Sequence, residues 1–310
     1  MDPACQNGLL AAAHCTPPTS RVSSVVETDP PVLATTDRRH FAIGAVASLA
    51  ALAAMGTAAA ATGMLPVPQR VRRMFTDTGP DGTIPQTSAG LISLDLKVSS
   101  ARGRQVGFFT AVPDGYGDGS GLPVCLILHG ASATTADYER FGFGQFLTAA
   151  VQAGAPPFVL AGADGGRTRW AGDGQGDAPQ RMLLDEVPAW CADRGFDRSR
   201  LAAYGWSLGG YGALLAEIRN PGLLRGVAAL SPAVGRDDEV AHHADELDPA
   251  RTAVWCGTGD ALHDDVVAMA SHIPGGPAIE SYSPGAHTRG YWNRVTPEAF
   301  RFIADSLTPA

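Results

Sequence analysis

A six-residue stretch in the middle of the chain, Gly205-Trp206-Ser207-Leu208-Gly209-Gly210, joins an apolar run to a segment of small residues. The run before it, Leu201-Ala202-Ala203-Tyr204, has the length and composition of a buried strand, and residues 208–219 predict a helix. Glycines two positions before and two positions after Ser207 allow a strand and a helix to pass closely at a sharp turn. The stretch therefore predicts a strand–turn–helix unit that raises the Ser207 hydroxyl above a sheet, an arrangement called a nucleophile elbow.

Short apolar runs recur along the chain, and stretches of helical composition separate them. Runs of this length are typical of strands that are buried on both faces of a parallel sheet. The expected strands cover residues 124–128, 158–161, 201–204, 227–230 and 253–256, and the expected helices cover residues 136–153, 182–194, 208–219, 263–271 and 297–306. Their alternation predicts an α/β fold with a mostly parallel central sheet and helices on both faces.

Residues 91–98 and 105–112 instead alternate apolar with polar side chains. This period predicts two paired strands, joined by a turn at Arg102-Gly103, that form an antiparallel margin of the sheet. With 310 residues and a hydrophobic content of 45%, the chain is long enough for one large α/β domain. The net charge of −8 and the lack of a Lys/Arg cluster in the body argue against a nucleic-acid partner and favour a small-molecule or lipid substrate.

The N-terminal part of the chain differs in kind from the rest. A Pro/Ser/Thr-rich stretch leads to Arg38-Arg39, and an apolar run from Phe41 to Ala54 and alanines at positions 58–61 follow. Paired arginines, an apolar core and small residues at a cleavage position are typical of a twin-arginine export signal. The weakly polar run from Phe41 to Leu65 is also long enough to span a bilayer, so a retained membrane anchor is the alternative.

These features divide the chain into an N-terminal extension with the signal or anchor (residues 1–61), a connecting segment rich in Pro, Gly and Thr (62–90) and the main domain (91–310). We expect export by the twin-arginine route to the cell envelope or the extracellular space, with membrane association if the anchor is retained. Three of the five cysteines lie in the main domain. Cys125 and Cys256 fall in apolar strands, where a buried thiol is expected, and an oxidising destination permits a Cys191–Cys256 disulfide.

A serine hydroxyl is a weak nucleophile until an imidazole accepts its proton, and the imidazole needs an anion to hold its tautomer. His287 lies in a loop just before the C-terminal helix, where an α/β fold of this type carries its base. Asp260 ends the stretch Cys256-Gly257-Thr258-Gly259-Asp260, between serine and histidine in chain order. We expect Ser207 to be the nucleophile, His287 the base and Asp260 the acid, with Asp264 and Asp265 as alternative acids.

The oxyanion of an acyl-transfer reaction needs two backbone N–H groups that point at it. We expect these from Leu208, directly after the nucleophile, and from Ala131, in the turn after the strand 126–128, with His129 bracing that turn. We expect His129, Trp170, Trp206 and Trp292 to be substrate-binding residues and Tyr138 to lie near the cleft; core packing is the alternative role for the aromatic residues. We expect no metal and no organic cofactor, because the cluster His242-His243 with Asp245 and Glu246 lacks a metal-ligand spacing.

Residues 91–307 resemble the esterase D / antigen 85 group of α/β-hydrolases, called the putative esterase family. The matching parts are Leu128-His129-Gly130-Ala131, Asp164-Gly165-Gly166 with Trp170, Glu186-Val187-Pro188, the Gly205–Gly210 elbow, Ser231-Pro232-Ala233, and Gly285-Ala286-His287 with Trp292. The resemblance implies an α/β-hydrolase fold with the roles given above. It implies an exported serine esterase that cleaves carboxylic esters through an acyl-enzyme, or transfers the acyl group to a sugar hydroxyl of the envelope.

The chain departs from one branch of this family at two positions, and two functions other than ester hydrolysis are also open. The mycolyltransferase branch usually carries an Asp-Gly-Leu type sequence at the oxyanion turn and a glutamate as the acid, whereas here His129-Gly130-Ala131 and Asp260 stand there, which argues against strict mycolyl transfer. A non-catalytic module that binds carbohydrate or a matrix protein is one alternative, although all three triad positions are filled. A thioesterase similar to S-formylglutathione hydrolase is another, and such an enzyme would lack an export signal.

Overall fold

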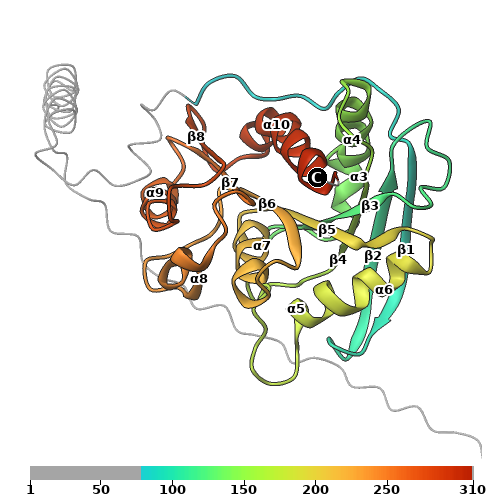
Figure 1. The fold of residues 1–310 in the computed structure, drawn as a ribbon, viewed down its shortest axis with the longest axis horizontal. Coiled ribbons are helices and arrows are strands. Elements are labelled where there is room, and N and C mark those ends of the chain that lie inside the picture. Colours follow the sequence, from blue (N-terminus) through green and yellow to red (C-terminus); the bar gives the residue numbers. More distant parts are fainter. Residues whose placement is uncertain (1–77, 309–310) are drawn as a thin grey trace, which may run out of the picture. The chain divides into compact units, whose positions relative to one another are not determined.

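A twisted mixed sheet forms the centre of the molecule (Figure 1). The computed structural model describes residues 78–308, and within them eight strands form one sheet in the order β1-β2-β4-β3-β5-β6-β7-β8. The first two strands are antiparallel to each other and β2 is antiparallel to β4, while all other neighbours are parallel. The strands are β1 (Leu91–Ser99), β2 (Arg104–Val112), β3 (Pro123–Leu128), β4 (Val159–Ala163), β5 (Asp197–Trp206), β6 (Leu224–Leu230), β7 (Thr252–Gly257) and β8 (Ile279–Ser283).

Helices cover both faces of the sheet and enclose two separate apolar clusters. One cluster lies under α3 (Asp137–Arg140), α4 (Phe143–Gln152) and α10 (Arg289–Leu307). The other lies under the π-helical turn Met182–Glu186, α6 (Val187–Ala192), α7 (Leu208–Arg219), α8 (Glu239–His242) and α9 (His263–Ala270). Short turns at α5 (Pro179–Arg181) and Ala244–Glu246 complete the set. The expected α/β architecture, a mostly parallel central sheet covered by helices on both faces, is therefore confirmed.

The strands follow the hydrophobic pattern of the sequence. Every residue of β3, β4 and β7 is buried, as a strand between two helical layers requires. The antiparallel margin predicted for residues 91–98 and 105–112 is confirmed as β1 and β2, and Gly103 in the connecting turn has a φ of +61°.

Three elements differ from the expectation. Strand β8 was not predicted, because its sequence Ile-Glu-Ser-Tyr-Ser is polar and it lies partly exposed at the sheet edge. The helix predicted for residues 136–153 is divided at Gly142, which adopts a φ of +77°. The C-terminal helix begins at Arg289 and not at Pro297, because the Thr288 hydroxyl accepts a hydrogen bond from the Tyr291 amide and caps it.

Residues 78–90 lie along α10 and α4 (Figure 1). The Gly82 amide donates to the carbonyl oxygen of Gly290 at 2.8 Å, and the side chain of Thr87 donates to that of Gln152 at 3.1 Å. This part of the connecting segment therefore covers the domain. The predicted export signal or anchor in residues 1–61 lies outside the described residues; among the residues that are described, no helix is long and apolar enough to cross a bilayer.

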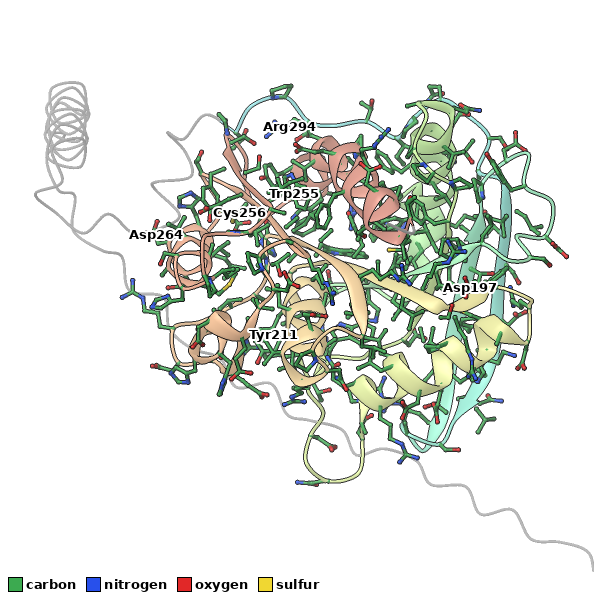
Figure 2. The ribbon with its side chains drawn as sticks, in the orientation of Figure 1. Asp197, Tyr211, Trp255, Cys256, Asp264 and Arg294 are labelled. Carbon is green, nitrogen blue, oxygen red and sulfur yellow. The ribbon has the colours of Figure 1, made fainter. Side chains whose placement is uncertain are left out.

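The cysteines of the main domain are three free, buried thiols, so the Cys191–Cys256 disulfide that an oxidising destination would permit is not formed. Cys191 lies on α6, which packs against β4 and β5, whereas Cys256 lies on β7 (Figure 2), two strands away from β5. Adjacent strands are about 4.8 Å apart, so the two backbones are separated by more than the roughly 7 Å that a disulfide can join.

Candidate active site

The turn between β5 and α7 has the geometry of a nucleophile elbow. Ser207 adopts φ 56° and ψ −120°, a conformation that a non-glycine residue rarely holds. Its amide donates to the carbonyl oxygen of Leu230 at 2.9 Å, and its carbonyl accepts from the Ala233 amide at 2.9 Å. A Cβ atom at Gly205 would overlap the backbone of Gly209, so the strand and the helix pass too closely for a side chain there. The flanking contacts therefore fix the strained turn and hold the hydroxyl in place.

Ser207, His287 and Asp260 meet at the carboxyl edge of the parallel strands. The His287 Nε2 lies 2.9 Å from the Ser207 Oγ, and its Nδ1 lies 2.8 Å from Asp260 Oδ2. Asp260 follows β7 and His287 follows β8, so each residue comes from the loop that leaves a different strand. The three side chains form one hydrogen-bonded chain from alcohol to imidazole to carboxylate, as the sequence led us to expect.

The Asp260 carboxylate is fully buried and well satisfied. Its second oxygen, Oδ1, accepts from the Leu262 amide at 3.0 Å. Burial raises the pKa of Asp260, but the hydrogen bond and the charge of His287 together outweigh it, so the pKa lies below its ordinary value of 3.8. The alternative acids lie elsewhere: Asp264 is on the exposed side of α9 beside His263 (Figure 2), and Asp265 forms an ion pair with Arg236.

The loop after β3 lies against the elbow. A Cβ atom at Gly130 would be 3.3 Å from the Ser207 Cβ and 2.9 Å from the indole nitrogen of Trp206, so only a glycine lets this loop approach. Ala131 follows in the same loop, and its carbonyl accepts from Arg167 Nε at 3.2 Å. Leu208 is the first residue of α7. The two backbone amides expected to form the oxyanion hole are thus on the loop and the helix end that flank Ser207.

His129 braces this loop, and both of its ring nitrogens have hydrogen-bond partners. Its Nδ1 lies 2.8 Å from the Gly130 oxygen, and its Nε2 accepts from the Gly165 amide at 3.0 Å. Burial lowers the pKa of His129, although its bond to the Gly130 carbonyl opposes this. The neutral ring, a donor at Nδ1 and an acceptor at Nε2, matches both partners. These bonds agree with a bracing role for His129, and a substrate-binding role stays a prediction, because the ring also borders the cavity beside Ala131.

The aromatic residues expected near the cleft are core residues. Trp170 is completely buried between Gly165 and Gly212, and its indole donates to the His129 carbonyl at 3.2 Å. Tyr138, Trp206 and Trp292 are also buried, at 0%, 3% and 8% exposure. Their large apolar area is used for packing beneath the site. Trp170 is fully buried and is not available for direct substrate contact, whereas substrate contact by Trp206 and Trp292 stays a prediction.

Trp292 packs against the ring of His287. Its ring meets the His287 ring edge-to-face with centroids 4.9 Å apart, and its indole donates to the Ser231 hydroxyl at 3.2 Å. Ser231 lies at the end of β6 and is fully buried, and its hydroxyl contributes to lowering the pKa of Asp260. In the sequence, Ser231 stands out only as part of the motif Ser231-Pro232-Ala233, because nothing in its local pattern shows that its hydroxyl reaches the acid.

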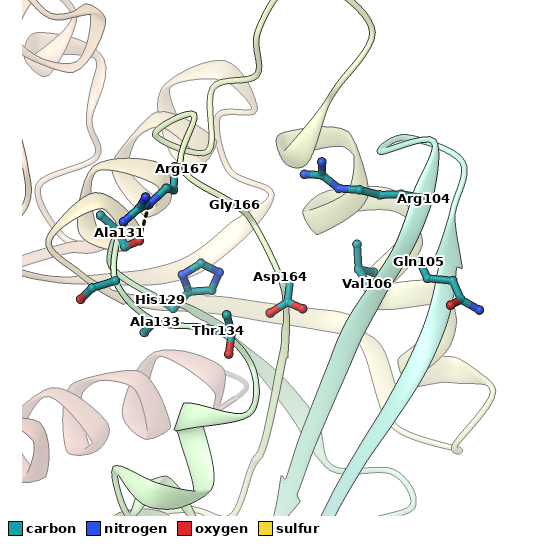
Figure 3. A pocket seen from close by; sticks show the side chains of 11 residues that line it. Arg104, Gln105, Val106, His129, Ala131, Ala133, Thr134, Asp164, Gly166 and Arg167 are labelled. Carbon is teal, nitrogen blue, oxygen red and sulfur yellow. Dashed lines mark hydrogen bonds between the residues drawn. The ribbon is translucent and has the colours of Figure 1, made fainter. Parts of the chain in front are cut away.

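A cavity of about 420 Å³, lined by both polar and apolar residues, opens beside the oxyanion loop (Figure 3). Arg104 and Gln105 reach it from β2, and Asp164 and Arg167 from the loop after β4. The lining also includes Ser132 and Thr134. The cavity therefore presents hydroxyl, amide, carboxylate and guanidinium groups beside the loop that carries Ala131.

No group of three or more His, Cys, Asp or Glu side chains that would suit a metal occurs in residues 78–308. Of the cluster that the sequence singled out, His243 Nδ1 lies 2.9 Å from Glu246 Oε1 in an exposed pair.

An elbow serine at the end of a central parallel strand, with an acid and a histidine on later loops, defines an α/β-hydrolase. The sequence profile described as Putative esterase matches residues 99–302, and the chain belongs to that family.

Solved structures share this fold at low sequence identity. A ferulic acid esterase matches with a TM-score of 0.60 and 19% identity, over 70% of this chain and 98% of its own. An S-formylglutathione hydrolase from Agrobacterium tumefaciens matches at 0.58 and 16%, over 72% and 98%. MPT51 from Mycobacterium tuberculosis matches at 0.53 and 16%, over 71% and 100%. A search of curated protein sequences found no match.

Proposed function

We propose that the protein is an exported serine esterase that cleaves carboxylic esters through an acyl-enzyme. The observation that carries the proposal is the continuous chain from Ser207 Oγ to His287 Nε2 (2.9 Å) and from His287 Nδ1 to Asp260 (2.8 Å). Membership of the Putative esterase family supports it. The reaction needs no metal or organic cofactor, because these side chains supply the nucleophile, the base and the acid.

The chemistry follows from the geometry. His287 Nε2 accepts the proton as Ser207 Oγ attacks the ester carbonyl carbon, and the amides of Leu208 and Ala131 stabilise the oxyanion. Collapse of the tetrahedral intermediate breaks the bond to the alcohol, which takes the proton from the imidazolium. Water then attacks the acyl-enzyme with His287 as base, the acid product leaves, and Ser207 regains its proton.

A sugar hydroxyl in place of water would make the same enzyme an acyltransferase. Three polar side chains in the cavity beside Ala131 support an alcohol portion with several hydroxyl groups, since Ser132, Thr134 and Gln105 can each hydrogen-bond to a hydroxyl. Hydrolysis of a chromogenic ester with and without a sugar such as trehalose separates the two. A rise in acyl-sugar product at constant ester consumption supports transfer, and free acid alone supports hydrolysis.

The nucleophile is tested by Ser207→Ala. We expect this variant to lose hydrolysis of 4-nitrophenyl butyrate by about 10³-fold or more and to lose labelling by a fluorophosphonate probe, because Ser207 is the one hydroxyl in residues 78–308 that lies at hydrogen-bond distance from an imidazole. Ser271→Ala, which removes an exposed hydroxyl bonded to a backbone carbonyl, is the matched control and should keep both. Retained turnover in Ser207→Ala with an intact circular dichroism spectrum would exclude the assignment.

The two other functions give different outcomes. A carbohydrate- or matrix-binding module would bind its ligand without turnover in the wild type, and would not react with the fluorophosphonate. A thioesterase similar to S-formylglutathione hydrolase would hydrolyse S-formylglutathione much faster than oxygen esters. The structural similarity to such an enzyme is the reason to include this comparison. The triad contacts favour catalysis over the binding module.

Export is proposed from Arg38-Arg39 and the apolar run that follows. Lysines at both positions should retain the precursor in the cytoplasm, because the twin-arginine route reads the paired guanidinium groups. Fractionation of the native host, with the wild type and Arg38→Lys/Arg39→Lys compared by immunoblot, measures this. Equal export of both would reject the route, and a full-length product in the membrane fraction would identify the segment as an anchor.

A further inference from the structure

Arg289 places a cation among aromatic rings at the first turn of α10. Its guanidinium carbon lies 4.0 Å from the Phe141 ring centroid, 4.5 Å from that of Trp206 and 5.1 Å from that of Trp292. Aromatic faces attract a cation, but they do not neutralise it. The side chain is partly exposed, so a ligand can reach it.

The guanidinium has no anionic partner in the described part of the chain. No ion pair or hydrogen bond of the Arg289 side chain occurs there, and its Nε is buried without a partner. Asp137 is near enough to act on it electrostatically, but that carboxylate binds Arg140, with Oδ1 2.6 Å from Nη2. Burial lowers the pKa of Arg289, yet an arginine remains charged at any physiological pH. The positive charge of Arg289 is therefore held in a partly apolar site, and its guanidinium has N–H donors without hydrogen-bond acceptors.

Two indoles connect this cation to the reacting groups. Trp206 directly precedes Ser207 in the elbow, and its ring also borders Gly130 of the oxyanion loop. Trp292 touches both the His287 ring, at 4.9 Å between centroids, and the Arg289 guanidinium. Arg289 itself lies two residues after His287. The cation thus lies within a small molecule's length of the triad.

We propose that Arg289 is a specificity-determining residue that binds a carboxylate on the ester substrate, so that the enzyme favours anionic over neutral esters. A carboxylate accepts two parallel hydrogen bonds from a guanidinium and supplies the missing counter-charge. The aromatic rings restrain the side chain and exclude water, which strengthens the pair. The inference rests on the proposed ester hydrolysis at Ser207.

The test compares esters that differ in one group. In the first pair, 4-nitrophenyl hemisuccinate replaces the terminal methyl of 4-nitrophenyl butyrate by a carboxylate on the acyl side. In the second pair, 4-acetoxybenzoate and its methyl ester differ on the alcohol side. Rates for Ser207→Ala are subtracted, because hemisuccinate esters also hydrolyse spontaneously. The quantity measured is the ratio of kcat/KM for the anionic ester to that for the neutral ester.

In the wild type we expect this ratio to exceed one for at least one pair. Arg289→Gln should lower it about tenfold or more, the effect of one charge-assisted hydrogen bond, chiefly through KM. Arg289→Lys should retain part of the preference. Arg301→Gln removes the same charge from an exposed pair with Asp305 on the same helix and should leave the ratio unchanged. A ratio that is the same in the wild type and Arg289→Gln for both pairs would overturn the inference while leaving the esterase proposal intact.

A binding measurement decides the case in which neither ester is hydrolysed, which would count against the proposed function. Trp206 and Trp292 flank the guanidinium, so glutarate should change the tryptophan fluorescence saturably in the wild type and not in Arg289→Gln. No saturable change in the wild type would reject the anion site. A change that persists in Arg289→Gln would also reject it.

Discussion

At the scale of single residues, the structure identifies which of three aspartates is the acid of the triad. Asp260, Asp264 and Asp265 were alternatives in the sequence, because all three follow the same strand. Only Asp260 reaches the His287 Nδ1, at 2.8 Å; the other two contact His263 and Arg236. The choice among them depends on how the loop after β7 turns, and no local pattern shows that.

Asp260→Asn should lower kcat for ester hydrolysis by about 10³- to 10⁴-fold, because an amide favours the imidazole tautomer that cannot accept the serine proton. Asp264→Asn and Asp265→Asn should each stay within about twofold of the wild type, since surface substitutions rarely disturb a distant site. Steady-state kinetics on 4-nitrophenyl butyrate checks all three. A larger loss in either control than in Asp260→Asn would assign the acid elsewhere.

Asp260 should also make stability depend on pH. Its pKa is lower in the folded protein than its ordinary value of 3.8, so the ionised carboxylate favours the folded state. That contribution is fully present above this value and is lost as the pH falls through the lower folded pKa. The difference in free energy of unfolding between the wild type and Asp260→Asn should therefore be larger near pH 6 than near pH 3, measured by urea denaturation. A constant difference would contradict the lowered pKa.

Other residues of the site show where sequence analysis fails. Ser207 and His287 were predictable because each lies in a motif with a fixed place in the fold. Trp170 was expected at the cleft, but two glycines, Gly165 and Gly212, leave a slot that its indole fills. Arg289 was not singled out, because its environment is built from residues 141, 206 and 292, which are far apart in the sequence.

At the scale of elements, the elbow depends on how closely α7 approaches β3. A Cβ atom at Gly209 would overlap the carbonyl of Leu128. Gly209→Ala should therefore reduce the free energy of unfolding by about 3 kcal/mol or more and abolish hydrolysis, because the displaced carbonyl leads into the oxyanion loop. Chemical denaturation and ester kinetics measure both effects.

Gly154→Ala is the control for Gly209→Ala, because it adds the same methyl group without a steric overlap. That glycine has a φ of +90° and open space around it, so only the backbone strain of roughly 1 kcal/mol is expected. If Gly209→Ala proves no more destabilising than Gly154→Ala, the close packing of helix on strand is not what the elbow requires.

Burial of the strands explains which of them could be predicted from the sequence and which could not. Strands buried on both faces have continuous apolar sequences, so β3 to β7 were visible in the chain. Strand β8 lies at the sheet edge with a polar, partly exposed sequence, so neither alternation nor an apolar run marks it. The first turns of α10 were missed because Pro297 suggested a helix start, whereas Pro297 lies inside the helix.

At the scale of the whole molecule, the thiols of the main domain carry a prediction about redox state. Burial raises the pKa of Cys191 to about 12 and also raises those of Cys125 and Cys256, so none is reactive. The melting temperature should be the same with and without dithiothreitol. Iodoacetamide should label these three cysteines only after denaturation, as peptide mass spectrometry would show. A crosslinked Cys191–Cys256 peptide would contradict the structure.

The stretch ahead of the first strand has a practical consequence for anyone who expresses the enzyme. Because Gly82 binds the Gly290 backbone near the start of α10, and Ile84 fills the space beside Gly142, a recombinant chain begun at Leu91 would expose apolar side chains on α4 and α10 to water. A vector that begins at or before Thr78 keeps those contacts, and a signal peptidase that cuts near residue 60 would leave them in the mature enzyme.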